Sequence, residues 1–243
     1  MTGMLASVNS VAEALQALSA NVDIIDLKQP ALGALGALEI DLVRTIVNEI
    51  NGRCPVSATV GDLPMQPELV FQAVTAMAAT GVDYVKIGFF PGGDWPGTLE
   101  KLATLPPSMA LIAVLFADSQ PDFSVIDNLK NAGFKGVMLD TMNKGCGSLT
   151  QIMTKTALAQ FVQLARERNL LCGLAGSLRR EDIAELMAYQ PDYLGFRGAL
   201  CRQHNRTAQL DRSAMRQIKQ AIDQISQSSQ QYCPAHQADD HAH

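Results

Sequence analysis

Histidine is scarce in this chain. Of the four histidines in 243 residues, three fall in the last eight positions, and only His204 lies in the body of the sequence. A site that binds metal through several imidazoles therefore cannot be assembled outside the tail. The shortage also leaves no basis for a Ser-His-Asp or Cys-His-Asn constellation, with His204 as the one imidazole available as acid or base. We expect neither a metal nor a cofactor.

Other absences narrow the class of protein further. The formal net charge is −5, so the chain has no basic excess that would favour nucleic acid as a partner. No run of about 18 apolar residues occurs, which argues against a membrane span. The five cysteines form no C-x-x-C pair. Together with the lack of a signal-peptide pattern, this predicts reduced thiols in a cytoplasmic protein.

Aromatic residues make up only 5% of the chain although 47% of it is hydrophobic, so the core must be mostly aliphatic. Short apolar runs alternate with amphipathic stretches about eight times, which predicts parallel strands separated by helices. The expected strands are 4–8, 22–27, 56–60, 84–88, 110–116, 136–139, 171–175 and 193–196. The expected helices are 10–19, 39–50, 66–80, 97–104, 121–132, 155–168, 179–188 and 207–225.

This pattern and length predict an α/β protein with a single (β/α)8 TIM barrel over residues 1–226. Residues 227–243 are rich in Ser, Gln, Ala, His and Asp without apolar periodicity, and we expect a disordered tail there. No second domain is predicted.

Charged residues fall where the predicted strands end, which is where the active sites of such barrels lie. Asp26 and Lys28 are two positions apart and so share one strand face, while Lys86, Asp140 and Lys144 lie at other strand ends. Clustered ammonium groups lower one another's pKa, which lets a neutral lysine attack a carbonyl as in class I aldolases. The alternative interpretation is a buried Asp–Lys pair that serves fold specificity.

A second group of residues follows the last two predicted strands. Gly176 and Ser177 follow the seventh, and Arg197, Gly198 and Ala199 follow the eighth. Loops at these places commonly bind phosphate through backbone N–H groups. Two alternatives stay open: the glycines could only form turns, and Arg197 could pair with an aspartate instead of a phosphate.

The segment 29–37, directly after Lys28, is apolar and rich in glycine. It is too irregular for a helix. A plain turn is one interpretation. We favour a loop that folds over the site and excludes water.

These residues form ordered motifs that resemble (5-formylfuran-3-yl)methyl phosphate synthase, also called 4-(hydroxymethyl)-2-furancarboxaldehyde-phosphate synthase, of methanofuran biosynthesis. The resemblance covers about residues 6–210. The motifs are DLKQPALGALGA at 26–37, SATVGD at 57–62, VKIG at 85–88, MLDTMNK at 138–144, LAGS at 174–177 and RGALC at 197–201.

The resemblance implies a lyase that condenses two glyceraldehyde 3-phosphate molecules into the phosphorylated furan aldehyde, with loss of phosphate and water. Lys28 would form the Schiff base and Lys86 would donate and accept protons. Asp26, Asp140 and Lys144 would support them. We weigh two other hypotheses: a class I aldolase acting on another phosphorylated sugar, and a non-catalytic barrel that binds a phosphometabolite. The expected partners are the triose phosphate and further copies of the chain in a homo-oligomer.

Overall fold

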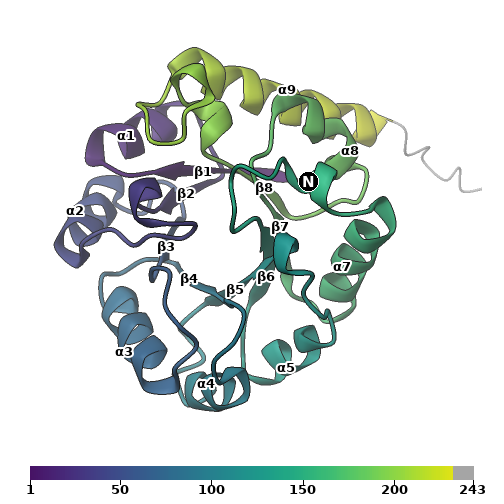
Figure 1. Ribbon diagram of the computed structural model, residues 1–243. Coiled ribbons are helices and arrows are strands. Elements are labelled where there is room, and N and C mark those ends of the chain that lie inside the picture. Colours follow the sequence, from purple (N-terminus) through teal and green to yellow (C-terminus); the bar gives the residue numbers. More distant parts are fainter. Residues whose placement is uncertain (232–243) are drawn as a thin grey trace, which may run out of the picture.

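The computed structural model describes residues 1–231, and the sheet in this part of the chain is a closed parallel barrel in the order β1 to β8 (Figure 1). The (β/α)8 prediction is confirmed. The strands are β1 Gly3–Val8, β2 Ile24–Leu27, β3 Val56–Thr59, β4 Tyr84–Gly88, β5 Leu111–Phe116, β6 Gly136–Asp140, β7 Leu171–Leu174 and β8 Tyr193–Phe196.

Helices surround the barrel and connect its strands (Figure 1). The α-helices are α1 Val11–Ser19, α2 Ile40–Ile50, α3 Pro67–Ala78, α4 Trp95–Leu102, α5 Val125–Asn131, α6 Leu149–Ile152, α7 Lys155–Glu167, α8 Ile183–Met187 and α9 Arg212–Gln231. The 3-10 turns are η1 Pro30–Leu32, η2 Ala117–Ser119, η3 Arg180–Asp182, η4 Gly198–Leu200 and η5 Arg202–His204. None of the described helices is long and apolar enough to cross a membrane.

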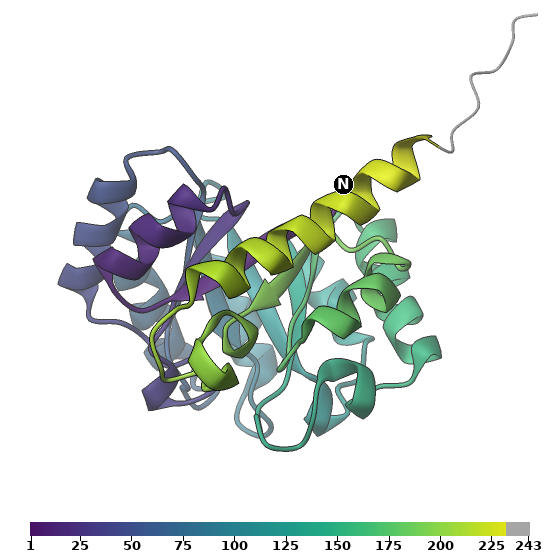
Figure 2. The same cartoon turned by 90° about the horizontal axis from the view of Figure 1, so that it is seen from above.

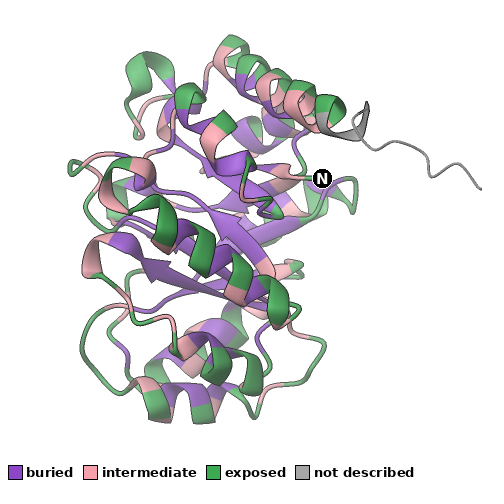
Figure 3. Ribbon diagram, turned by 90° about the vertical axis from the view of Figure 1, so that its right-hand side faces the viewer, coloured by how far each residue is buried: buried purple, intermediate pink, exposed green. Residues whose placement is uncertain are grey.

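The strands are buried on both faces, which explains their unalternating apolar sequences. Every residue of β5 is buried, and Figure 3 shows the buried strands inside helices whose outer faces are exposed. One apolar cluster packs the helices against the sheet. A second, smaller cluster fills the barrel interior around Leu5, Ile112, Val114 and Met138. The interior is therefore a packed core, and the site can open only at its end.

The structure departs from the predicted helices in two connections. α6 lies in a polar stretch for which no helix was predicted, and it begins with a capping box in which Gln151 accepts the Ser148 N–H at 2.9 Å. α5 begins at Val125 instead of residue 121. Asp122 accepts the Ser124 N–H at 2.9 Å there, which forms a turn that holds the preceding residues out of the helix.

The last helix lies further along the chain than predicted. α9 begins at Arg212 because residues 201–211 first fold back through a bridge between Cys201 and Leu210. It continues through residues 227–231, which were predicted to be disordered, because no glycine or proline interrupts the sequence before Pro234. Figure 2 shows its end projecting beyond the barrel. The rest of the predicted tail, 232–243, lies outside the described residues.

Candidate active site

A buried ion pair spans the barrel interior between β2 and β4. The Lys86 ammonium donates a 2.9 Å hydrogen bond to Oδ1 of Asp26, and the two side chains are 2% and 0% exposed. Ser57 donates to the same oxygen at 2.7 Å, and Ser7 donates to Oδ2 at 2.8 Å. The sheet register places Ser7, Asp26 and Ser57 side by side, which is why both hydroxyls reach this carboxylate.

Asp26 is held as a carboxylate. Its burial alone would raise its pKa, but the nearby Lys86 and Lys28 ammonium groups, with the Ser57 hydrogen bond, lower that pKa overall. A charge that is both paired and fully hydrogen-bonded is tolerated inside a barrel. Asp26 therefore acts as a fixed counter-charge beneath the lysines.

Lys28 follows β2 and is buried, yet its amine is only loosely paired. Its Nζ lies 3.9 Å from Oδ2 of Asp140, and it makes no hydrogen bond within the described part of the chain. The pKa of Lys28 is lowered to about 8, mainly by burial and also by the Lys144 and Lys86 charges, whereas Asp140 and Asp26 oppose the change. At neutral pH a fraction of this amine is uncharged and nucleophilic.

Asp140 ends β6 and holds a second lysine. The Lys144 ammonium donates to its Oδ1 at 2.5 Å. Burial alone would raise the pKa of Asp140, but the Lys144 and Lys28 ammonium groups outweigh it and lower that pKa to about 2. Asp118 holds the start of the loop that follows β6 and carries Lys144, because its carboxylate accepts the N–H groups of residues 142–143 at 2.8 and 2.7 Å.

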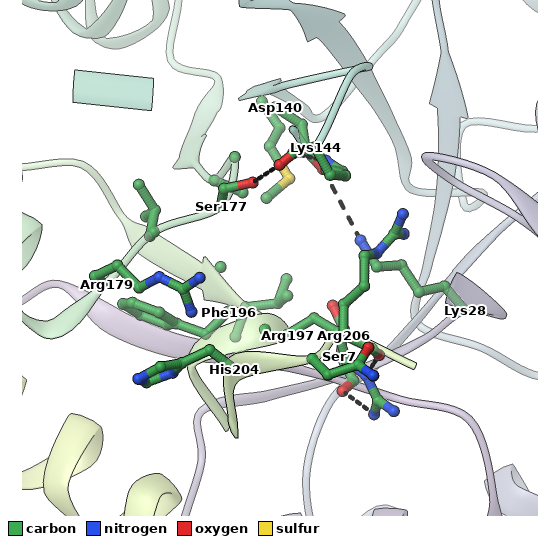
Figure 4. Close-up of a pocket in the computed structure, with 18 of the residues that line it drawn as sticks. Ser7, Lys28, Asp140, Lys144, Ser177, Arg179, Phe196, Arg197, His204 and Arg206 are labelled. Atoms are coloured by element: carbon green, nitrogen blue, oxygen red, sulfur yellow. Dashed lines mark hydrogen bonds and ion pairs between the residues drawn. The ribbon is translucent and has the colours of Figure 1, made fainter. Parts of the chain in front are cut away.

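These groups meet at a cavity of about 260 Å³ in the barrel mouth (Figure 4). The structure thus brings together the lysines and aspartates that the sequence singled out, with Asp26 just beneath the cavity. Cations outnumber carboxylates on its walls. The charged side chains that matter here are Lys28, Lys86, Asp140, Lys144, Arg179 and Arg206. Such a site suits an anionic ligand.

The predicted phosphate loops contribute unequally. Gly176, Ser177 and Gly198 line the cavity, whereas Ala199, within η4, packs into the apolar core and is not part of the wall. Gly176 has φ +112°, and a Cβ there would lie 2.8 Å from Cγ2 of Thr141. Only glycine fits at this position. The N–H groups of Gly176 and Ser177 donate no hydrogen bond among the described residues, and both residues line the cavity.

Arg197 is already fully engaged. Its guanidinium donates to both carboxylate oxygens of Glu13, at 2.5 and 3.3 Å. It also donates to the carbonyls of Ser7 at 3.1 Å, Arg206 at 2.8 Å and Ala208 at 3.1 Å. These contacts use all five of its N–H groups. The structure therefore favours the ion-pair alternative over the phosphate-ligand role predicted for Arg197, with a glutamate as the partner.

Two arginines on the cavity wall were missed by the sequence reasoning. Arg179 lies just before η3, and Arg206 lies in the loop between η5 and α9. Both are in irregular segments where no periodicity reveals which way a side chain points. His204, the one imidazole outside the tail, lies exposed at the rim of the same cavity.

The segment after Lys28 folds inward over part of the mouth. Asp62 accepts the N–H groups of Ala34 at 2.7 Å and Leu35 at 2.6 Å. Leu35 is fully buried against the end of β4, in the same apolar cluster as Phe116. On the other side, Arg206 donates to the carbonyl of Gly33 at 2.8 Å. This geometry agrees with a covering loop better than with a plain turn.

A sequence profile of the 4-HFC-P synthase family matches residues 4–219. The chain belongs to this family of enzymes. A (5-formylfuran-3-yl)methyl phosphate synthase of Methanosarcina acetivorans is 34% identical over 208 residues, which are 81% of this chain and 89% of that protein. A Methylorubrum extorquens protein, to which the same activity is assigned provisionally, is 42% identical over 219 residues, or 90% of this chain and 91% of that protein.

Solved structures support the architecture of this family member. Phosphoribosyl anthranilate isomerase of Thermus thermophilus superposes with a TM-score of 0.65 and 14% identity, covering 93% of this chain and all of that one. At this identity the likeness shows the barrel fold and carries no information about the reaction.

Proposed function

We propose that this protein condenses two molecules of glyceraldehyde 3-phosphate into (5-formylfuran-3-yl)methyl phosphate, releasing one phosphate and two water molecules, as a step of methanofuran biosynthesis. Membership of the family supports the overall reaction. The observation that carries the chemistry is Lys28, a buried amine at the cavity whose pKa is lowered to about 8 and which lacks a close acceptor. Such an amine is suited to form an imine with an aldehyde.

In this proposal the neutral Nζ of Lys28 attacks the aldehyde carbon of one triose. Lys86, hydrogen-bonded to Asp26, gives a proton to the departing hydroxyl, which leaves as water and yields the iminium ion. The now neutral Lys86 takes the proton from the adjacent carbon and regains its charge. The resulting enamine is the nucleophile for carbon–carbon bond formation with the second triose.

Asp140 and Lys144 have supporting roles in this scheme. The Asp140 carboxylate stabilises the iminium charge at Lys28, 3.9 Å away in the free enzyme. Lys144 is hydrogen-bonded to the same carboxylate, and its positive charge helps keep Lys28 deprotonated.

The test is reduction with borohydride in the presence of glyceraldehyde 3-phosphate, followed by peptide mass spectrometry. We expect a stable adduct on Lys28 and none in Lys28→Ala. Lys155→Ala, which removes an exposed lysine outside the site, serves as the matched control and should keep the adduct. Absence of any lysine adduct would contradict imine chemistry and favour the binding-protein hypothesis.

Product analysis separates the synthase from an aldolase. A furan aldehyde absorbs strongly in the near ultraviolet, and an aldol product does not. An adduct on Lys28 without a furan product would support an aldolase acting on another phosphorylated sugar.

A further inference from the structure

The proposed reaction brings two phosphorylated trioses into one cavity. Resting on that proposed function, we propose that the cavity has two separate phosphate-binding positions, one at Arg179 with the Gly176–Ser177 backbone and the other at Arg206.

Arg179 is prepared to bind an anion. Its Nη1 atom is buried and has no hydrogen-bond partner within the described residues. A buried donor without an acceptor is costly, and a phosphate oxygen would supply the acceptor that the protein does not. In the lining of the same cavity, the N–H groups of Gly176 and Ser177 are also without an acceptor among the described residues. Together they offer a guanidinium and two amides to one phosphate.

Arg206 offers a second guanidinium from a different loop. One of its nitrogens donates to the carbonyl of Gly33 at 2.8 Å, and its other N–H groups have no acceptor among the described residues. That single bond orients the side chain while leaving most of its donors for a ligand. Burial lowers the pKa of Arg206, with Asp140 and Asp62 opposing, so the group gains from an anionic partner.

Arg197, which lies between these two arginines in the sequence, adds no donor to either position. Arg197 lies on the same wall, but all of its donors are committed to Glu13 and to backbone carbonyls. Figure 4 shows Arg179 reaching into the cavity from the wall opposite Lys28. Two phosphate dianions repel each other, so a site that holds both needs cations at separate places.

The experiment is equilibrium dialysis of the whole protein against radiolabelled inorganic phosphate. We expect two phosphate ions per chain in the natural protein and one in either Arg179→Gln or Arg206→Gln. The lost position should bind about 10- to 100-fold more weakly, as expected when a charge-assisted hydrogen bond is removed. Arg180→Gln and Arg202→Gln remove exposed neighbours on the same loops and should keep two. Circular dichroism would establish that every variant is folded.

A single phosphate in the natural protein, or an unchanged stoichiometry in either test variant, would overturn the two-position proposal. The dialysis does not depend on catalysis. If borohydride trapping at Lys28 fails but the two phosphate positions behave as expected, the proposed function falls and this inference stands. If trapping succeeds and the stoichiometry is one, the inference alone is wrong.

Discussion

The amine nitrogen of Lys28 lies 3.9 Å from Oδ2 of Asp140, inside the range of an ion pair and outside that of a hydrogen bond. By contrast, Lys144 bonds directly to the other oxygen of the same carboxylate. Asp140 thus forms a hydrogen bond with Lys144 and only a loose ion pair with Lys28. The loosely held amine is the one whose pKa is lowered to about 8.

The first prediction concerns pH. Imine formation needs the uncharged amine, so the rate of adduct formation on Lys28 should rise about tenfold per pH unit below 8 and level off above it. The measurement is the initial trapping rate between pH 6 and 10. A flat profile across this range would show that Lys28 is not the titrating nucleophile.

The second prediction tests the role of the neighbouring charge. Lys144→Met removes a cation that lowers the pKa of Lys28 and frees Asp140 to raise it. The inflection in the trapping profile should therefore move above pH 8, and the rate at pH 7 should fall. Lys144→Arg retains the charge and is the control, for which we expect a profile close to that of the natural protein.

The third prediction concerns the ion pair beneath the cavity. Lys86→Met leaves the Asp26 carboxylate buried without its cation, which should reduce the free energy of unfolding by about 3 kcal/mol. Arg44→Gln breaks the exposed pair with Asp41 and should cost less than about 1 kcal/mol. Urea unfolding measures both. Equal losses in the two variants would mean that burial of the Lys86 pair has no energetic consequence.

The fourth prediction separates structure from binding at Arg197. Glu13→Gln leaves that guanidinium without its counter-charge and should also reduce the free energy of unfolding by about 3 kcal/mol. Because Glu13 contributes to neither phosphate position, the folded variant should still bind two phosphate ions in dialysis. If the folded Glu13→Gln variant bound only one phosphate ion, the Glu13–Arg197 pair would have to contribute to a phosphate position.

The fifth prediction concerns the covering loop. Asp62→Asn replaces a carboxylate that accepts two N–H groups, so hydrogen exchange at Ala34 and Leu35 should accelerate by at least about tenfold. Asp83 makes a similar bond to the Val56 N–H at the start of β3. Asp83→Asn should leave exchange at Ala34 and Leu35 unchanged, which distinguishes local opening from general destabilisation.

The strands were predictable because each is a short apolar run between helices, and most of their bounds agree within one or two residues. The i, i+2 spacing of Asp26 and Lys28 predicted that they share one strand face, and the structure buries both side chains. Their catalytic roles stay predictions. The two serines that donate hydrogen bonds to Asp26 could not be identified from the sequence. Ser7 and Ser57 meet Asp26 only through the sheet register.

Long-range pairing explains why the sequence did not reveal the partner of Arg197 in the loop after β8. Arg197 and Glu13 are 184 positions apart, and only the closure of the barrel brings β8 back beside β1 and the helix that follows it. A sequence shows that an arginine follows a strand, but it does not show which acceptors the chain delivers to it. For the same reason, the sequence did not show that N–H groups of Arg179 and Arg206 would be left without protein acceptors.

The apolar side chains packed around Leu35 affect the electrostatic field in the cavity. The apolar cluster that contains this side chain and Phe116 also contains Leu5 and Met138, which line the cavity that the lysines and arginines share. Hydrocarbon polarises far less than water. The positive charges of the cavity are therefore weakly screened on the side where these apolar side chains form its wall. A low-dielectric wall beside a group of like charges concentrates their field toward the opening. A protein whose net charge is −5 can in this way present a locally attractive entrance to a doubly charged anion.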